Sequence, residues 1–347
     1  MKISREGAWL TNPWFDSIFL LAIPSIFIIM FLGFSPRALF PGNGAYIVYL
    51  LKKYLILLGT AHLIATVFIV FLDQNELRSR LFRYLWIPLL LIFVYIILRV
   101  RGFQDLNATA LFYIIIVHII FQNLFIMLAY NFTQAQYPKI DAVINAAAIL
   151  MGPPYFLFWA VRYIKFDYGG LVANFYINKY ILTGMGVLAF FSIAVFMARQ
   201  VYIYLKWKRI AVFNILIVLI SNSVFYFPLL VFKNSDVFMI GGFKCYHSLQ
   251  FLGWLVLYCQ LKFKEYRIKG PEFLAGFHLP HRAISLFVFF IFFGFIFIVI
   301  AKPTVLFFRK VIIYESIYYY FVIFHQWMDA FIWWNPRRIS NLIALNK

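Results

Sequence analysis

Four histidines lie deep within apolar segments of this chain, where an ionisable side chain is costly and usually functional. The chain has six histidines, and the four deep ones are His62, His118, His247 and His325. Imidazole is a common metal ligand and suits iron, copper and zinc. The sequence therefore predicts that these four residues bind a buried transition metal or a haem iron.

Three of these histidines have a polar companion one helical turn further along the chain. The companions are Gln122 after His118, Gln250 after His247 and Asp329 after His325. Residues three or four apart lie on the same face of a helix. We therefore predict that these side chains orient the imidazoles as outer partners, or take part in catalysis themselves.

Lys244 is a further catalytic candidate, because it lies three residues before His247. An ammonium group there is placed to meet an anionic group of a substrate or to pair with Asp329. Snorkelling of the lysine toward the membrane surface is the alternative interpretation. His62 differs from the other three, because Thr66 occupies the position four residues after it.

A purely structural role for the same histidines is the competing interpretation. Ser, Thr, Asn, Gln and His side chains form hydrogen bonds that hold membrane helices together. The remaining histidines, His278 and His281, flank a proline and are predicted to lie in an interfacial loop. No G-x-S-x-G, H-E-x-x-H or P-loop pattern occurs in the chain.

The elements that carry these residues are predicted to be membrane-spanning helices. Hydrophobic residues make up 65% of the 347 residues and charged residues 12%, whereas soluble domains are about 45–50% apolar and about 25% charged. Lipid requires every backbone polar group to be paired within the protein, and runs this long and continuous favour helices. The fold class is therefore all-α, a polytopic helical bundle of about ten transmembrane helices.

Ten apolar windows define these predicted spans. They cover residues 15–34, 54–72, 84–100, 108–130, 141–163, 179–202, 210–232, 237–261, 283–301 and 312–334. Pro24 predicts a kink in the first span. The sequence Gly152-Pro153-Pro154 predicts that the fifth span is interrupted, as in helices that line a cavity.

Basic residues between the spans predict the orientation of the chain. Their excess is modest and favours both termini on the cytoplasmic side. Residues 1–347 then form a single multi-span domain, whose longest polar loop, 262–282, is cytoplasmic. The compact loops, the low charge content and only two cysteines favour a bacterial inner membrane.

The net charge of +19 does not indicate a nucleic-acid partner. The basic residues occur in short clusters between apolar runs, as expected for contact with anionic lipid headgroups. The two cysteines, Cys245 and Cys259, lie in one apolar segment and predict no disulfide framework. Membrane lipid and a hydrophobic small molecule are the predicted partners, and the sequence leaves the oligomeric state open.

The four deep histidines lie in even-numbered spans, which all run in the same direction. Each is near the middle of its span, so the four imidazoles can converge at one depth. The leading hypothesis is a membrane enzyme, an oxidoreductase or transferase, whose histidine-rich metal site acts on a lipid, isoprenoid or quinone.

Two other classes of function use the same residues. Buried His, Asp and Lys side chains can relay protons in a transporter or proton-coupled permease. A metal-free transferase with a histidine as general base, or a non-catalytic membrane scaffold, are the remaining alternatives.

Overall fold

In the part of the chain that the computed structural model describes, the regular structure is helical apart from one short hairpin. The structure describes residues 13–34, 42, 44–72, 77–78, 80–132, 139–163, 167–168, 171–172, 178–208, 210–232, 244–259, 288–289, 291–292, 296, 324–325 and 327. Most of the predicted ninth span and most of the tenth lie outside these residues.

The helices overlap the apolar windows of the sequence, although α4 begins at Gly44 and its window only at residue 54, and the two strands lie between the fifth and sixth windows. Their bounds are α1 Pro13–Phe15, η1 Asp16–Leu20, α2 Ile23–Gly33, α4 Gly44–Leu72, η2 Phe82–Trp86, α6 Ile87–Val100, α7 Gln104–Phe132, α8 Lys139–Tyr163, β1 Asp167–Tyr168, β2 Leu171–Val172, α9 Lys179–Trp207, α10 Val212–Tyr226, η3 Phe227–Val231 and α12 His247–Cys259, where η marks a π-helical turn.

Several of these helices are long and apolar enough to cross a membrane. In the described residues there are 4 such helices, within α7, α8, α9 and α10 with η3, or up to 5 if the bent segment Pro13–Gly33 is one span. The chain is thus a multi-pass helical protein. The count of ten spans stays a prediction.

The contacts divide the chain into two compact units. The first unit comprises Met1–Lys52, Ile119–Gly253 and Pro336–Lys347, and the second comprises Lys53–His118 and Trp254–Asn335. Each unit therefore combines stretches that are distant in the sequence.

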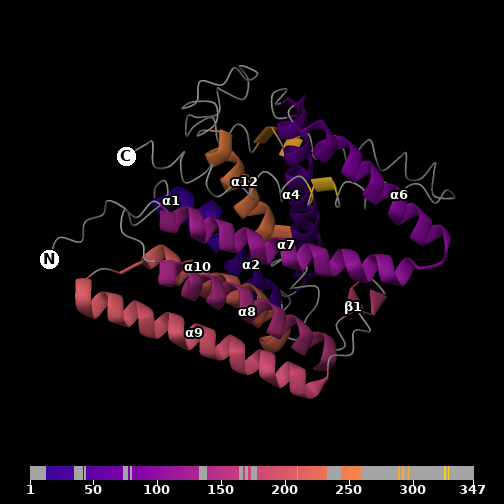
Figure 1. Cartoon of the computed structure of the whole chain (residues 1–347). Helices are drawn as coiled ribbons and strands as arrows, with labels where there is room; N and C mark the ends of the chain where they lie inside the picture. The colour runs from indigo at the N-terminus through magenta and orange to yellow at the C-terminus, as the bar shows by residue number, and fades with distance from the viewer. Residues whose placement is uncertain are drawn as a thin grey trace. The chain divides into compact units, whose positions relative to one another are not determined.

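The first unit is built around α8, which packs against α9 and α10 (Figure 1). The antiparallel strands β1 and β2 lie between α8 and α9 in the sequence. Arg199 near the end of α9 donates to Asp141 near the start of α8, with Nε 2.6 Å from Oδ1. This ion pair joins opposite ends of two consecutive helices, which are therefore antiparallel, as expected for neighbouring spans.

The Gly152-Pro153-Pro154 segment does not interrupt its helix, so that prediction was wrong. Helix α8 continues through both prolines, although each proline lacks an N–H and removes one intrahelical hydrogen bond. Asn222 of α10 donates to the Ala148 carbonyl at 3.3 Å, one residue before the first carbonyl that a proline leaves without its N–H. This bond ties the proline-containing stretch of α8 to a neighbouring helix.

The first span bends at Leu21–Ala22, just before the proline that predicted a kink. The two helical pieces, Pro13–Leu20 and Ile23–Gly33, meet at 47°. Ala22 has a left-handed conformation with φ of 48°, and its carbonyl accepts from the Ser25 hydroxyl at 2.6 Å. The kink is therefore produced by a backbone reversal at Ala22, followed by Pro24 at the start of α2.

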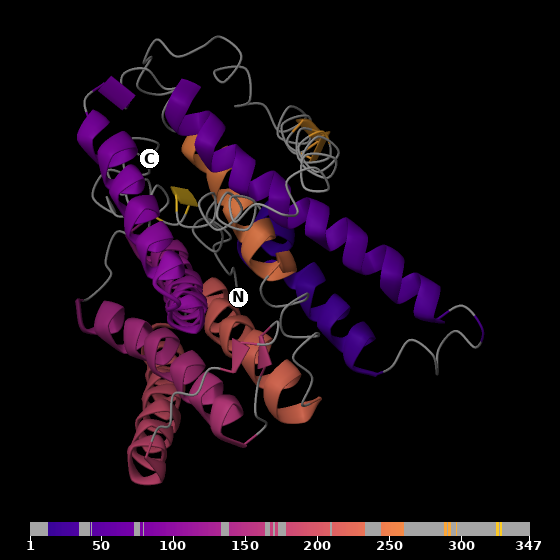
Figure 2. The same cartoon turned by 90° about the vertical axis from the view of Figure 1, so that its right-hand side faces the viewer.

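The second unit contains most of α4, together with η2, α6 and the first part of α7. Helix α4 is one continuous helix of 29 residues without a proline, and Figure 2 shows its unbroken course. Its residues 61–66 are buried. This buried segment carries His62 and Thr66 and positions the candidate site.

Candidate metal centre

His62 and His325 form a buried pair in the second unit. Their Nε2 atoms lie 2.7 Å apart, and the two rings meet edge to face with centroids 4.2 Å apart. The side chains are 6% and 1% exposed. A pair of imidazoles this deep in an apolar protein must satisfy its polar atoms within the protein.

The second nitrogen of each ring of this pair is bound to an oxygen of α4. Nδ1 of His62 lies 2.8 Å from the Gly59 carbonyl oxygen, one turn earlier in the helix. Nδ1 of His325 lies 2.7 Å from the Thr66 hydroxyl oxygen. The partners of both Nδ1 atoms therefore lie on α4, Gly59 about one turn before His62 and Thr66 about one turn after it.

These contacts fix the tautomers of the two neutral rings. A carbonyl can only accept, so Nδ1 of His62 carries the proton and its Nε2 accepts. Nε2 of His325 then donates to His62, and Nδ1 of His325 accepts from the Thr66 hydroxyl. The result is a hydrogen-bonded chain from Thr66 through both imidazoles to Gly59.

Two aromatic residues beside His325 hold its segment against α4 and η2. The ring of Phe324 stacks on Phe71 of α4, with centroids 6.1 Å apart. The indole N–H of Trp327 donates to the Arg83 carbonyl at 2.9 Å. These contacts secure the chain on both sides of the imidazole, which limits the freedom of His325.

His118 of α7 lies beside the same pair. Its ring centroid is 5.7 Å from that of His325, and its side chain is half-buried. Three of the four deep histidines are thus neighbours within the second unit, as the sequence predicted from their common depth.

The geometry of the pair allows a metal ion with a small adjustment. His62 and His325 belong to a buried histidine group that could hold a metal ion. Two imidazole nitrogens bound to one tetrahedral metal at about 2.0–2.1 Å lie about 3.3 Å apart. The pair at 2.7 Å would therefore open by about 0.6 Å to admit an ion.

His247, the fourth predicted ligand, belongs to the first unit. It is the first residue of α12 and is buried. Its role as a ligand stays a prediction from the sequence.

The companions Gln122 and Gln250 bond to one another in the first unit. Nε2 of Gln122 donates to Oε1 of Gln250 at 3.4 Å and to the His247 carbonyl at 3.3 Å. Nε2 of Gln250 donates to the Leu20 carbonyl and to Oδ1 of Asn123, both at 2.9 Å. The two carboxamides therefore tie α12 to α7 and η1, and their predicted roles as imidazole partners stay predictions.

Of the other two catalytic candidates, the structure describes only Lys244. It lies in the turn just before α12 and is half-buried. Asp329 lies outside the described residues, as do His278 and His281.

Asn123 of α7 accepts from both Gln250 and the Tyr246 hydroxyl, which are hydrogen bonds between helices. The sequence did not predict the positions of two other polar residues. Thr66 is the hydroxyl partner of His325, and its position four residues after His62 was the available signal. Asp16 is completely buried in η1, and its place at the edge of the first span gave no sign of this.

Comparison with known protein families, curated proteins and solved structures finds no match to this chain. The case for its function therefore depends on the site alone.

Proposed function

We propose that this protein is a polytopic membrane metalloenzyme in which Nε2 of His62 and Nε2 of His325 bind one transition-metal ion. The observation that carries the proposal is the arrangement of the pair. Both Nε2 atoms point to one place, and both Nδ1 atoms are hydrogen-bonded to oxygen. Metal-binding histidines typically donate their other ring N–H to an oxygen, as Nδ1 of His62 does to the Gly59 carbonyl. The Thr66 hydroxyl can take the same role for Nδ1 of His325, because a hydroxyl accepts as well as donates.

The residues around the pair fit a metal of the imidazole-binding class, namely iron, copper or zinc. His118 is proposed as an additional ligand, because its ring lies beside that of His325, and the sequence adds His247 as a further candidate. With an ion at its Nε2, His325 would carry its proton on Nδ1 and donate it to the Thr66 hydroxyl oxygen, the reverse of the direction in the metal-free pair.

Such an ion would supply Lewis-acid or redox chemistry inside an apolar protein. The proposed substrate is hydrophobic, a lipid, an isoprenoid or a quinone, because a site at this depth is reached through the membrane. The chain's own contribution is to exclude water with the buried residues 61–66 of α4 and to hold both imidazoles in position through their Nδ1 contacts. The membrane is proposed to be the bacterial inner membrane.

Metal content tests the proposal directly. We expect the detergent-purified protein to contain stoichiometric iron, copper or zinc by elemental analysis, and His62→Ala and His325→Ala each to lose it. Gln200→Ala is the matched control, since Gln200 is a buried polar residue of α9 in the first unit. Metal that stays bound in both histidine variants, or a folded wild-type protein that binds none of these metals, would overturn the proposal.

A proton relay is the second candidate, because the bonds from Thr66 through His325 and His62 to Gly59 form a continuous chain. Two imidazoles in series can pass a proton by changing tautomer. Uptake by proteoliposomes that depends on pH, and that His62→Ala abolishes in a metal-free protein, would favour this transporter function.

A further inference from the structure

We infer that the C-terminal end of α9 binds the anionic headgroup of a phospholipid. We call this surface the α9 cluster, and it consists of Arg199, Tyr202, Lys206, Trp207 and Lys208. It belongs to the first unit, so the inference is independent of the proposed metal site. The partner is identified by its chemistry, which is a phosphate-bearing headgroup attached to acyl chains.

Four members of the α9 cluster, Arg199, Tyr202, Lys206 and Trp207, combine positive charge with aromatic rings in mutual contact. Lys208 follows α9 as its C-cap and lies over Tyr204 instead. Tyr202 and Lys206 follow Arg199 at the three- and four-residue intervals that share a helix face. The Arg199 guanidinium lies 4.9 Å from the centre of the Tyr202 ring and 5.7 Å from that of Trp207. The Lys206 ammonium lies 5.6 and 5.2 Å from the same two rings.

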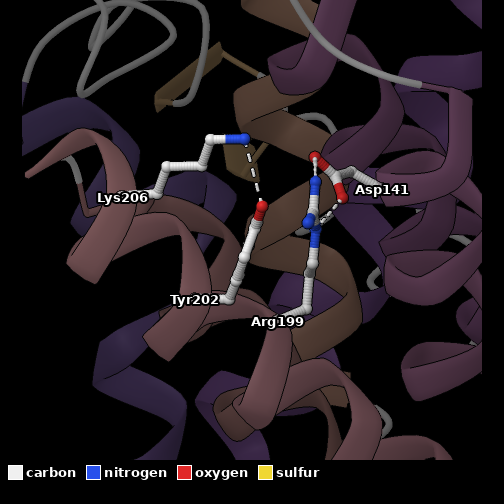
Figure 3. A network of polar contacts seen from close by, with 4 residues as sticks. All are labelled: Asp141, Arg199, Tyr202 and Lys206. Atoms are coloured by element: carbon white, nitrogen blue, oxygen red, sulfur yellow. Dashed lines mark hydrogen bonds and ion pairs between the residues drawn. The ribbon is translucent and has the colours of Figure 1, made fainter.

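Figure 3 shows how the polar groups of this surface are directed. The Arg199 guanidinium faces the Asp141 carboxylate of α8, while the Lys206 ammonium reaches the Tyr202 hydroxyl at 3.1 Å. Asp141 therefore balances the charge of Arg199. Lys206 and Lys208 are left as the excess positive charge of the cluster.

These two lysines have donor capacity for a phosphate group. An ammonium has three donor hydrogens, and Lys206 uses one for Tyr202. Lys208 lies over the Tyr204 ring at 5.5 Å. Within the described residues, neither lysine has a carboxylate at ion-pair distance.

The surroundings of the cluster match the boundary between acyl chains and headgroups. Tyr202 is 44% exposed and Trp207 45%, and amphipathic aromatic rings are typical of this boundary. Further back along α9 the exposed residues are apolar, as the lipid-facing side of a span requires; they include Val187, Leu188, Phe190 and Phe191. A lipid can therefore lay its chains along α9 with its phosphate at the end of the helix, within the positive charge of Lys206 and of the C-cap residue Lys208.

The simpler explanation for the two lysines is the helix end itself, where cations are favoured by the helix dipole. That explanation accounts for their charge but not for the paired rings that hold Lys206 over Tyr202 and Trp207. The excess charge also fits the orientation that the sequence predicts, because this end of α9 then faces the cytoplasmic leaflet, which is rich in anionic lipids.

Native mass spectrometry of the full-length protein, titrated with phosphatidylglycerol or phosphatidylcholine, tests the inference. We expect phosphatidylglycerol to bind more tightly, and Lys206→Gln and Lys208→Gln each to weaken that binding roughly fivefold. Lys206→Arg should keep the affinity within about twofold, because a guanidinium also binds phosphate. Lys179→Gln is the matched control, since Lys179 lies at the other end of α9 against Tyr180.

Three results would overturn the inference. The first is equal binding of the two lipids by the wild-type protein. The second is an equal loss of phosphatidylglycerol in Lys179→Gln and Lys206→Gln, which would show a general charge effect. The third is displacement of the lipid by an equal concentration of inorganic phosphate, which would make the ligand a free anion.

Discussion

At the scale of single residues, the hydroxyl of Thr66 is a small group whose removal we expect to have a large effect on metal binding. It is the oxygen partner of Nδ1 in His325, and as a hydroxyl it can donate to this nitrogen or accept from it. Threonine and valine have similar shapes but differ in this one polar group. Substitution of Thr66 therefore separates the hydrogen bond from the packing of α4.

We expect Thr66→Val to weaken metal binding by about 10–100-fold, because loss of an outer partner of a ligating histidine has that typical effect. Competition with a chelator of known affinity measures the change. Thr66→Ser keeps the hydroxyl and should retain most of the affinity. Equal affinity in the wild type and in Thr66→Val would show that the hydroxyl does not support the ligand.

The histidines and their polar companions show how much of the site could be predicted from the sequence. The common depth of the histidines predicted that His62, His118 and His325 would be neighbours, because helix rise converts sequence position into depth. The companions behaved differently, since Gln122 and Gln250 share a hydrogen bond with each other. Spacing along one helix predicts which face a side chain occupies, but the neighbouring helix decides its partner.

At the scale of elements, the contact between α8 and α10 depends on a residue without a side chain. A Cβ atom at Gly152 would overlap the carboxamide of Asn222, the residue that donates to the Ala148 carbonyl. Small residues let membrane helices approach closely enough for such polar contacts. The absence of a side chain at Gly152 therefore leaves the room that the Asn222 carboxamide occupies.

We expect Gly152→Ala to destabilise the protein by about 1–3 kcal/mol, the usual cost of inserting atoms into a packed interior. Thermal unfolding in detergent measures it. Asn222→Ala removes the overlapping group, so the double variant should lose less stability than the sum of the single variants. Additive losses would show that the two positions do not interact. Gly184→Ala is the control, because a Cβ atom there meets nothing within 4 Å.

The prolines of α8 show where a local rule fails. Proline removes a hydrogen bond wherever it occurs in a helix, and this rule predicted an interruption. Helix α8 instead continues while packed against α9 and α10, whose contacts come from later parts of the chain and do not enter the local rule.

At the scale of the whole molecule, the prediction with the widest consequence is the orientation in the membrane. Helix α9 has 29 residues and is about 43 Å long, which exceeds a hydrocarbon core of about 30 Å. Its two ends should therefore lie on opposite sides of the bilayer. The basic residues predict that Lys208 is on the cytoplasmic side and Lys179 on the other.

Cysteine labelling checks this orientation in a Cys245→Ser, Cys259→Ser background. We expect a membrane-impermeant thiol reagent to label Lys179→Cys in right-side-out vesicles and Lys208→Cys only in inverted ones. The opposite pattern would reverse the predicted topology. Labelling of both positions from one side would show that α9 does not cross the membrane.

The pairing of His62 with His325 can form only late in the synthesis of the chain. The two residues are 263 positions apart, so at about 5–20 residues per second the ribosome needs roughly 13 to 53 s to make the second after the first. During that interval His62 of α4 lacks its partner His325. A nascent chain that stops before residue 325 cannot form the pair, so the presence of the pair distinguishes full-length chains from truncated ones.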